Sequence, residues 1–187
     1  LYTGLITLLT SCLVWAQILG GARPEIRLLQ MTDALSIVFR MDRLSVVFAG
    51  LIAFLWPIAV LYAHEYMAHE ERESPFFAWY TMSYGVTLAV ACAENYFTLY
   101  VFYELLTLVT MPLVLHKKDA RSVHAARKYL YYSITGAALG FIGLIFLLTY
   151  GTTINFTFGG VLDASVTGGD KRSMLLLIYC IAFCGFG

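Results

Sequence analysis

The sequence Asn95-Tyr-Phe-Thr-Leu-Tyr-Val-Phe-Tyr-Glu-Leu-Leu-Thr-Leu-Val-Thr-Met-Pro-Leu-Val-Leu115 is uncharged except for Glu104, near its middle. As an α-helix it would be about 30 Å long, which is the thickness of the hydrocarbon core of a bilayer. An ionised carboxylate at that depth costs about 2.5 to 3.5 kcal/mol on insertion scales, and so needs a partner, a proton or water. Glu104 is therefore the first candidate for a functional residue.

The composition of the whole chain agrees with a membrane protein. The 187 residues are 60% hydrophobic and 13% charged, whereas soluble domains are about 25% charged. The mean hydropathy is +0.75, and the charges lie in clusters between long apolar runs. We predict an all-α, polytopic bundle of transmembrane helices. The net charge of zero, with no basic patch beside aromatic residues, argues against nucleic-acid binding.

We expect one membrane domain with transmembrane helices at about residues 2–20, 44–64, 76–93, 96–116, 126–150 and 174–187. The last segment would rise only about 21 Å as a helix, so it is expected to be an incomplete span. Because the sequence also starts at Leu1 rather than Met, we expect the chain to be cut at both its start and its end. The start has no basic region and no cleavage site of the kind found in a signal peptide.

The connections between these helices differ in character. Residues 23–40 contain short β-prone stretches, which predict a small hairpin or an irregular loop at the membrane surface. Asn95 is a candidate N-cap in a very short connection, so the two flanking helices should be antiparallel neighbours. Pro57 and Pro112 should kink their helices. Residues 151–171 are rich in glycine and threonine, which predicts a loop.

The orientation in the membrane depends on where lysine and arginine lie. If the loops alternate between the two sides, the basic residues divide equally, but residues 116–128 hold the densest cluster. Short basic loops carry most weight in the positive-inside rule. We therefore expect residues 116–128 to face the cytoplasm.

Around Glu104, the helical period places a partly polar stripe on one side of its helix, formed by Tyr100, Tyr103, Glu104, Thr107 and Met111. Such a stripe is expected to face the bundle interior or a hydrated cavity. Burial favours the neutral form of a carboxyl group and a nearby cation favours the ionised form, so Glu104 could act in a proton relay. The alternative is a carboxyl group that only joins two helices by hydrogen bonds.

The next helix brings a lysine towards this region. If that helix starts near Ser122, Lys128 lies about 9 Å along it, where its ammonium group can either reach inward or extend back to water. The second arrangement is the more common one, but Glu104 has no other counter-charge in an adjacent helix. Arg127 is expected to be solvated or to contact lipid headgroups. His124, one turn before Lys128, is a candidate supporting residue, as is Pro112.

Other motifs favour structure over chemistry. Gly136 and Gly140 form a G-x-x-x-G pattern, which allows close helix approach. The cysteines lie within apolar stretches without metal-ligand spacing, and the histidines cluster near helix ends. We expect no metal and no cofactor. No constellation of nucleophile or ligands suggests a membrane enzyme that is catalytic by itself.

Four stretches carry a resemblance to a known family. They are Phe39-Arg-Met-Asp-Arg-Leu-Ser45, residues 62–66, residues 94–106 with the buried glutamate, and Ala125-Ala-Arg-Lys-Tyr-Leu130. These resemble the antiporter-like subunits of respiratory complex I, of Mrp-type cation/proton antiporters and of energy-converting membrane hydrogenases. Tyr103 departs from the family pattern, in which Trp or Phe is more common. The resemblance covers the chain from about residue 30.

The resemblance implies the N-terminal part of an antiporter-like fold of about 14 helices built from inverted repeats. It implies that Glu104 pairs with a lysine of the seventh helix, located after Gly187, and that Lys128 matches a second lysine that modulates it. Asp42 and Asn95 match structural positions. By the same resemblance, residues 116–128 face the cytoplasm of a bacterial or archaeal cell membrane, and other membrane subunits are the partners.

Three functions remain open from the sequence. The first is proton pumping driven by a redox reaction in a complex I-like or hydrogenase-like assembly. The second is Na⁺/H⁺ exchange in an Mrp-type complex. The third, from a different class, is a scaffold subunit that takes no part in transport.

Overall fold

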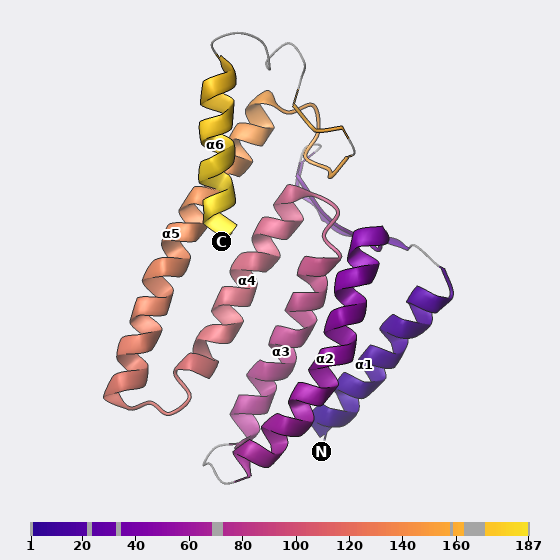
Figure 1. Ribbon diagram of the computed structural model, residues 1–187, viewed down its shortest axis with the longest axis vertical. Helices are drawn as coiled ribbons and strands as arrows, with labels where there is room; N and C mark the ends of the chain where they lie inside the picture. Colours follow the sequence, from indigo (N-terminus) through magenta and orange to yellow (C-terminus); the bar gives the residue numbers. More distant parts are fainter. Residues whose placement is uncertain are drawn as a thin grey trace.

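The computed structural model describes residues 2–21, 24–32, 35–68, 73–157, 159–162 and 171–186. Its elements are, in chain order, α1 (Tyr2–Leu19), β1 (Glu25–Gln30), β2 (Ser36–Arg40), α2 (Arg43–Met67), α3 (Glu73–Ala91), α4 (Tyr96–Val114), α5 (Ala120–Tyr150) and α6 (Lys171–Phe186). Successive helices run in alternating directions and lie side by side, with the hairpin at the end of the bundle where α2 and α4 begin (Figure 1). The expected all-α, polytopic bundle is confirmed.

Within the described residues, four helices are long and apolar enough to cross a bilayer, namely α1, α2, α4 and α5. Leu61 of α2 is 69% exposed and Leu108 of α4 is 59% exposed, as expected of side chains that face lipid. The chain is a multi-pass membrane protein. α6 is shorter, with 16 residues, and its expected end at Gly187 lies outside the described residues.

α3, which overlaps the expected span 76–93, is more polar than the apolar stretches of these four helices. It has 19 residues, as many as α4, but its Ser, Thr and Tyr residues lower its hydropathy. Several of these polar groups point at neighbouring helices: Ser83 and Tyr84 are buried, and the Tyr84 hydroxyl lies 2.7 Å from the Ser11 hydroxyl of α1. α3 packs between α2 and α4, and its polarity serves contacts inside the bundle.

The helix that contains the expected span 126–150 begins several residues before that span. α5 starts at Ala120, because the Asp119 carboxylate accepts a hydrogen bond of 2.7 Å from the Ser122 amide and caps the helix. The hydrogen bonds from Ser122 also hold the pKa of Asp119 below its ordinary value. The first turns of α5 are therefore a charged, amphipathic entry to the apolar part of the helix.

α2 begins in a similar way, at residue 43. Asp42 is its N-cap and accepts a hydrogen bond of 2.7 Å from the Ser45 amide. Burial by itself raises the pKa of Asp42, but the hydrogen bonds from Ser45 and Leu44 and the charge of Arg40 together hold it below the ordinary value. α2 continues through Pro57 to Met67, as α4 continues through Pro112 to Val114.

A small sheet covers the end of the bundle at which α4 begins. β1 and β2 form an antiparallel hairpin, within the region where a hairpin or irregular loop was expected. In addition to the hairpin pairing, Phe39 of β2 forms a bridge with Ala93, and Asn95 forms a bridge with Asn155. The short connection between α3 and α4 is therefore bonded on one side to the hairpin and on the other to the segment that follows α5.

α5 and α6 approach each other through glycines. A Cβ atom at Gly136 would lie 2.8 Å from the carbonyl oxygen of Gly185, and one at Gly185 would lie 2.6 Å from the amide nitrogen of Gly140. Both distances are shorter than a carbon atom can accept. Close packing therefore requires glycine on both helices, which places the C-terminal end of α6 beside the middle of α5 and α4.

Candidate functional site

Glu104 lies near the middle of α4 and is half-buried. Within the described part of the chain, its carboxylate makes no hydrogen bond and no ion pair. The phenol groups of Tyr100 and Tyr103, on the same helix, are close enough to interact electrostatically with the carboxylate. Glu104 thus has polar surroundings without a fixed cationic partner among the residues that the structure describes.

The stripe expected on α4 faces other helices of the bundle. The Tyr103 hydroxyl donates a hydrogen bond of 3.1 Å to the carbonyl oxygen of Phe186 at the end of α6. The Tyr100 ring packs against Phe141 of α5, with ring centroids 5.9 Å apart. Tyr96, one turn earlier, donates a hydrogen bond of 3.0 Å to the carbonyl oxygen of Gly140. Tyrosines therefore fasten the Glu104 helix to α5 and α6.

Beside this stripe is a cavity of about 310 Å³ between α2, α3, α4 and α5. Its lining is mostly polar or aromatic and consists of Trp56, Ser83, Thr87, Tyr103, Leu106, Thr107, Thr110 and Tyr129. Tyr103 and Thr107 belong to the stripe, whereas the other lining residues come from all four helices. The volume is enough for several water molecules, each of which takes about 30 Å³ in the liquid.

The Ser and Thr hydroxyl groups around this cavity donate hydrogen bonds to backbone carbonyl oxygens of their own helices. Ser83 donates to Tyr80, at 2.8 Å, and Thr87 donates to Ser83, at 2.7 Å. Thr110 donates to the Leu106 carbonyl at 2.9 Å and lies 2.8 Å from the Tyr129 hydroxyl. A hydroxyl oxygen that donates one hydrogen bond can still accept another, so these groups could accept hydrogen bonds from water in the cavity.

One donor completes the lining. The indole Nε1–H of Trp56 is buried and has no hydrogen-bond partner among the described residues. An unpaired buried N–H costs about 1 to 3 kcal/mol, whereas a water molecule in the cavity would satisfy it. Acceptor oxygens together with an unpaired N–H are the groups that hold ordered water.

The structure does not bring Lys128 or His124 to Glu104. Both side chains are exposed on the surface of α5, and Lys128 makes no ion pair with a described acidic residue. The next residue, Tyr129, is the one that faces α4. Successive helical residues differ by about 100° in direction, so the contact of Tyr129 with Thr110 turns Lys128 away from the cavity.

Sequence reasoning missed Trp56, Ser83, Thr87, Thr110 and Tyr129. A weak signal was present, because Ser83 and Thr87 lie four residues apart in one helix, as hydroxyls on one face do. Their convergence with groups of α2, α4 and α5 depends on the rotation of each helix about its axis, which one sequence does not specify.

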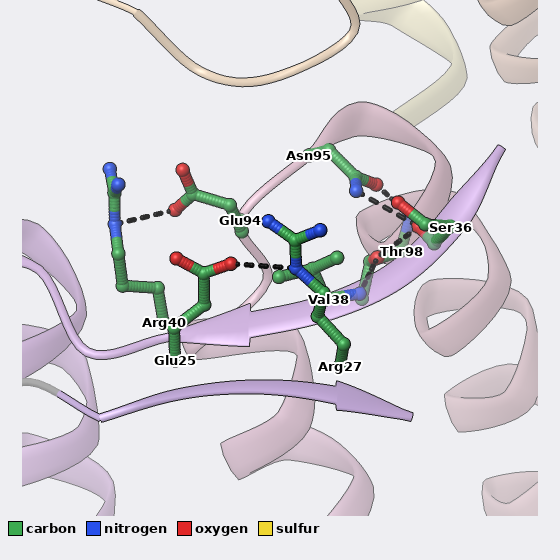
Figure 2. A network of polar contacts seen from close by, with 8 residues as sticks. All are labelled: Glu25, Arg27, Ser36, Val38, Arg40, Glu94, Asn95 and Thr98. Carbon is green, nitrogen blue, oxygen red and sulfur yellow. Dashed lines mark hydrogen bonds and ion pairs between the residues drawn. The ribbon is translucent and has the colours of Figure 1, made fainter. Parts of the chain in front are cut away.

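A cluster of charged side chains lies at the N-terminal end of α4 (Figure 2). Arg40 Nε lies 2.8 Å from a carboxylate oxygen of Glu94, and Arg27 Nε lies 3.0 Å from Glu25. Burial raises the pKa of Glu94, and the positive charge of Arg40 only partly offsets this effect. The ion pair and the raised pKa are compatible because the Glu94 side chain is only 11% exposed and has lost most of its hydration. These charged groups line a surface cavity of about 560 Å³ with residues 151–155.

Within the described residues, no group of three or more His, Cys, Asp or Glu side chains is arranged to hold a metal ion. His64 lies 3.0 Å from Glu73 where α2 ends and α3 begins, and His69 lies outside the described residues. The four cysteines are free thiols.

Two family sequence models match the chain. One, described as NADH-Ubiquinone oxidoreductase (complex I), chain 5 N-terminus, matches residues 29–77. The other, described as NADH:quinone oxidoreductase/Mrp antiporter, TM, matches residues 93–187, which is half of the chain. The second match includes Glu104, Lys128 and the α5–α6 glycines.

Individual relatives point in the same direction. A protein of Rhizobium meliloti, named as a probable subunit of a K(+)/H(+) antiporter, is 33% identical over 114 residues, which are 60% of this chain and 11% of that protein. A Na(+)/H(+) antiporter subunit of Alkalihalophilus pseudofirmus is 30% identical over 128 residues, 65% of this chain and 15% of that protein. The chain thus spans a small part of the length of these relatives.

A solved structure has the same fold. A chain of the membrane-bound sulfane sulfur reductase, an archaeal respiratory membrane complex, aligns with 81% of this chain and 31% of its own length, with a TM-score of 0.62 and 16% identity.

Proposed function

Because the chain belongs to the NADH:quinone oxidoreductase/Mrp antiporter family, we propose that it is part of a membrane subunit that moves protons across the bilayer through Glu104. The observation that carries the proposal is a carboxyl group in the middle of a membrane helix, with no ion pair among the described residues, next to a cavity that can hold water. Such a group can take up and release a proton as the charges around it change.

The cavity supplies a path to this carboxyl group from one side. It reaches from Tyr103, next to Glu104, to Thr110, which lies about 10 Å further along α4 than Tyr103. It therefore extends towards the 115–119 connection, which we propose faces the cytoplasm. Water in the cavity would accept and pass protons between hydroxyl oxygens, with the Trp56 N–H holding one water in place.

The cationic partner of Glu104 is the second part of the proposal. By family resemblance this partner is a lysine of the seventh helix of the family fold. Lys128 is exposed on α5, so we assign it a modulating role, as a positive charge close to the cavity wall formed by Tyr129. Other membrane subunits would complete the transporting complex.

A substitution at Glu104 tests the relay. Glu104→Gln keeps the size and hydrogen-bonding capacity of the side chain but cannot be ionised. In the full-length protein, assembled with its partner subunits in liposomes, we expect proton flux to fall at least about tenfold, which corresponds to about 1.4 kcal/mol. Glu25→Gln, an exposed carboxylate of the hairpin, is the matched control. Flux close to that of the wild type in Glu104→Gln would refute the relay.

A second function is exchange of an alkali cation for protons, favoured by the relatives that are named K(+)/H(+) and Na(+)/H(+) antiporter subunits. The driving force distinguishes antiport from redox-driven proton pumping. Sodium-dependent proton exchange by the purified complex without an electron donor indicates antiport, whereas flux that requires a reductant indicates redox-driven pumping. A scaffold subunit would give flux that is indifferent to substitution of both Glu104 and Lys128.

A further inference from the structure

The first turn of α4 is bonded to the hairpin by two fully buried polar side chains, Asn95 and Thr98, both 0% exposed. The amide of Val38 in β2 donates a hydrogen bond of 3.0 Å to the Thr98 hydroxyl. Asn95 Nδ2 donates a bond of 2.9 Å to the carbonyl oxygen of Ser36. Figure 2 shows both side chains pointing from the start of α4 to the strand. We call these two bonds the β2–α4 clamp.

Asn95 has two separate tasks. Its Oδ1 accepts a bond of 2.7 Å from the Thr98 amide and caps α4, while its Nδ2 makes the bond to Ser36. Capping would need only an acceptor, and serine or aspartate would supply one. The amide is the side chain that can cap the helix and donate to the strand at the same time.

Backbone bonds hold the same turn from both sides. The Glu94 amide donates to the Val38 carbonyl at 3.1 Å, and the Tyr96 amide donates to the Ile154 carbonyl at 3.0 Å. Phe39 of β2 also packs edge-on against Phe102 of α4, with ring centroids 5.0 Å apart. The start of α4 is therefore fixed in depth and rotation by the hairpin and by the segment after α5.

Glu104 lies six residues after Thr98, about 9 Å along the same helix. An uninterrupted helix transmits a shift or rotation of its first turn to this position, because no glycine or proline separates Thr98 from Glu104. The titratable groups that surround Glu104 are Tyr100 and Tyr103 of α4, with Tyr129 of α5 near Tyr103. A change in the position of α4 would alter the distance between the carboxylate and the cavity.

We propose that Asn95 and Thr98 are positioning residues for proton transfer, and that the β2–α4 clamp sets the depth and direction of Glu104 in the bundle. The clamp is made at the surface sheet and acts on a group inside the membrane. The inference rests on the proposed role of Glu104 but concerns a separate property, the protonation equilibrium of that carboxyl group.

The test is an infrared titration of the Glu104 carboxyl band in the full-length complex, with the band assigned by its loss in Glu104→Gln. Thr98→Val keeps the shape of the side chain and removes the acceptor for Val38. We expect the titration midpoint to move by about 0.5 pH unit or more, a roughly threefold change in proton affinity. Thr98→Ser should restore the wild-type midpoint. Amide exchange at Val38 should rise in the valine variant only.

Asn95→Ser provides a second variant, because serine keeps the cap and loses the bond to Ser36. We expect a midpoint shift in the same direction as for Thr98→Val. If both variants assemble and titrate as the wild type does, while Thr98→Val shows faster exchange at Val38, the clamp is merely structural and the inference is wrong. Normal flux in Glu104→Gln would instead refute the relay, while the titration would still decide whether the clamp positions the carboxyl group.

Discussion

At the scale of single residues, the unpaired indole of Trp56 is as informative as the unpaired carboxylate of Glu104. Each is a polar group of the bundle interior without a protein partner among the described residues, and the hydroxyl-lined cavity lies between α2 and α4, from which they come. A dry cavity would leave both groups unsatisfied, whereas water would satisfy the N–H and provide a proton path to the carboxylate.

Trp56→Phe separates the two possibilities, because it removes the N–H and keeps a large aromatic ring. If water is bound there, we expect proton flux to fall severalfold while assembly and thermal stability change little, by about 1 kcal/mol or less. Trp79→Phe, on the partly exposed face of α3, is the control. Unchanged flux together with a gain in stability would indicate a dry cavity.

Two carboxylates at the hairpin end should give pH dependences of opposite sign. The folded-state pKa of Glu94 is raised by burial, so its contribution to stability is present at low pH and is lost as the pH rises through that pKa. The folded-state pKa of Asp42 is lowered from 3.8, so its contribution is present above 3.8 and is lost as the pH falls through the folded-state value.

We therefore expect Glu94→Gln to become progressively more stable relative to the wild type as the pH rises through the raised pKa of Glu94. Asp42→Asn should be less stable than the wild type at neutral pH, and the difference should shrink below about pH 3.8. Thermal unfolding in detergent over a series of pH values measures both. Parallel profiles for the two variants would contradict the assignment.

At the scale of elements, the contact between α5 and α6 depends on the absence of side chains at glycines. Gly136→Ala would place a Cβ atom 2.8 Å from a backbone carbonyl oxygen of Gly185, which cannot rotate away. We expect a loss of about 1 to 3 kcal/mol in stability. Gly85→Ala on α3 is the matched control, because nothing lies within 4 Å of its Cβ. The control should be neutral or slightly stabilising, because alanine favours helix.

The positions of the helices could be predicted from the sequence, whereas the direction of individual side chains could not. Each apolar run overlaps a helix that the structure describes, because burial in lipid leaves a strong pattern in composition. α5 begins at Ala120, two residues before the helix start near Ser122 that the sequence suggested, because Asp119 caps it. The direction of Lys128 could not be predicted, because it depends on the contact between Tyr129 and Thr110, which joins two helices.

At the scale of the whole molecule, the fold has two different ends. The hairpin, the α3–α4 connection and residues 151–157 lie at one end, and the 115–119 connection lies at the other (Figure 1). The cavity extends from the level of Glu104 towards the second end, and the β2–α4 clamp holds α4 from the first. In the proposed relay, protons would therefore enter from the side of the membrane opposite to the clamp that positions α4.

The sidedness of these two ends is the remaining prediction. Lys118 lies in the α4–α5 connection, and basic residues around it should keep that end in the cytoplasm, whereas Gln30 ends β1 at the other surface. In a full-length protein without its native cysteines, we expect Gln30→Cys to react with a membrane-impermeant thiol reagent in intact cells, and Lys118→Cys to react only in inverted vesicles. The reverse labelling pattern would mean that the orientation in the membrane is opposite to the predicted one. The cavity would then extend towards the outside, and Glu104 would receive protons from that compartment.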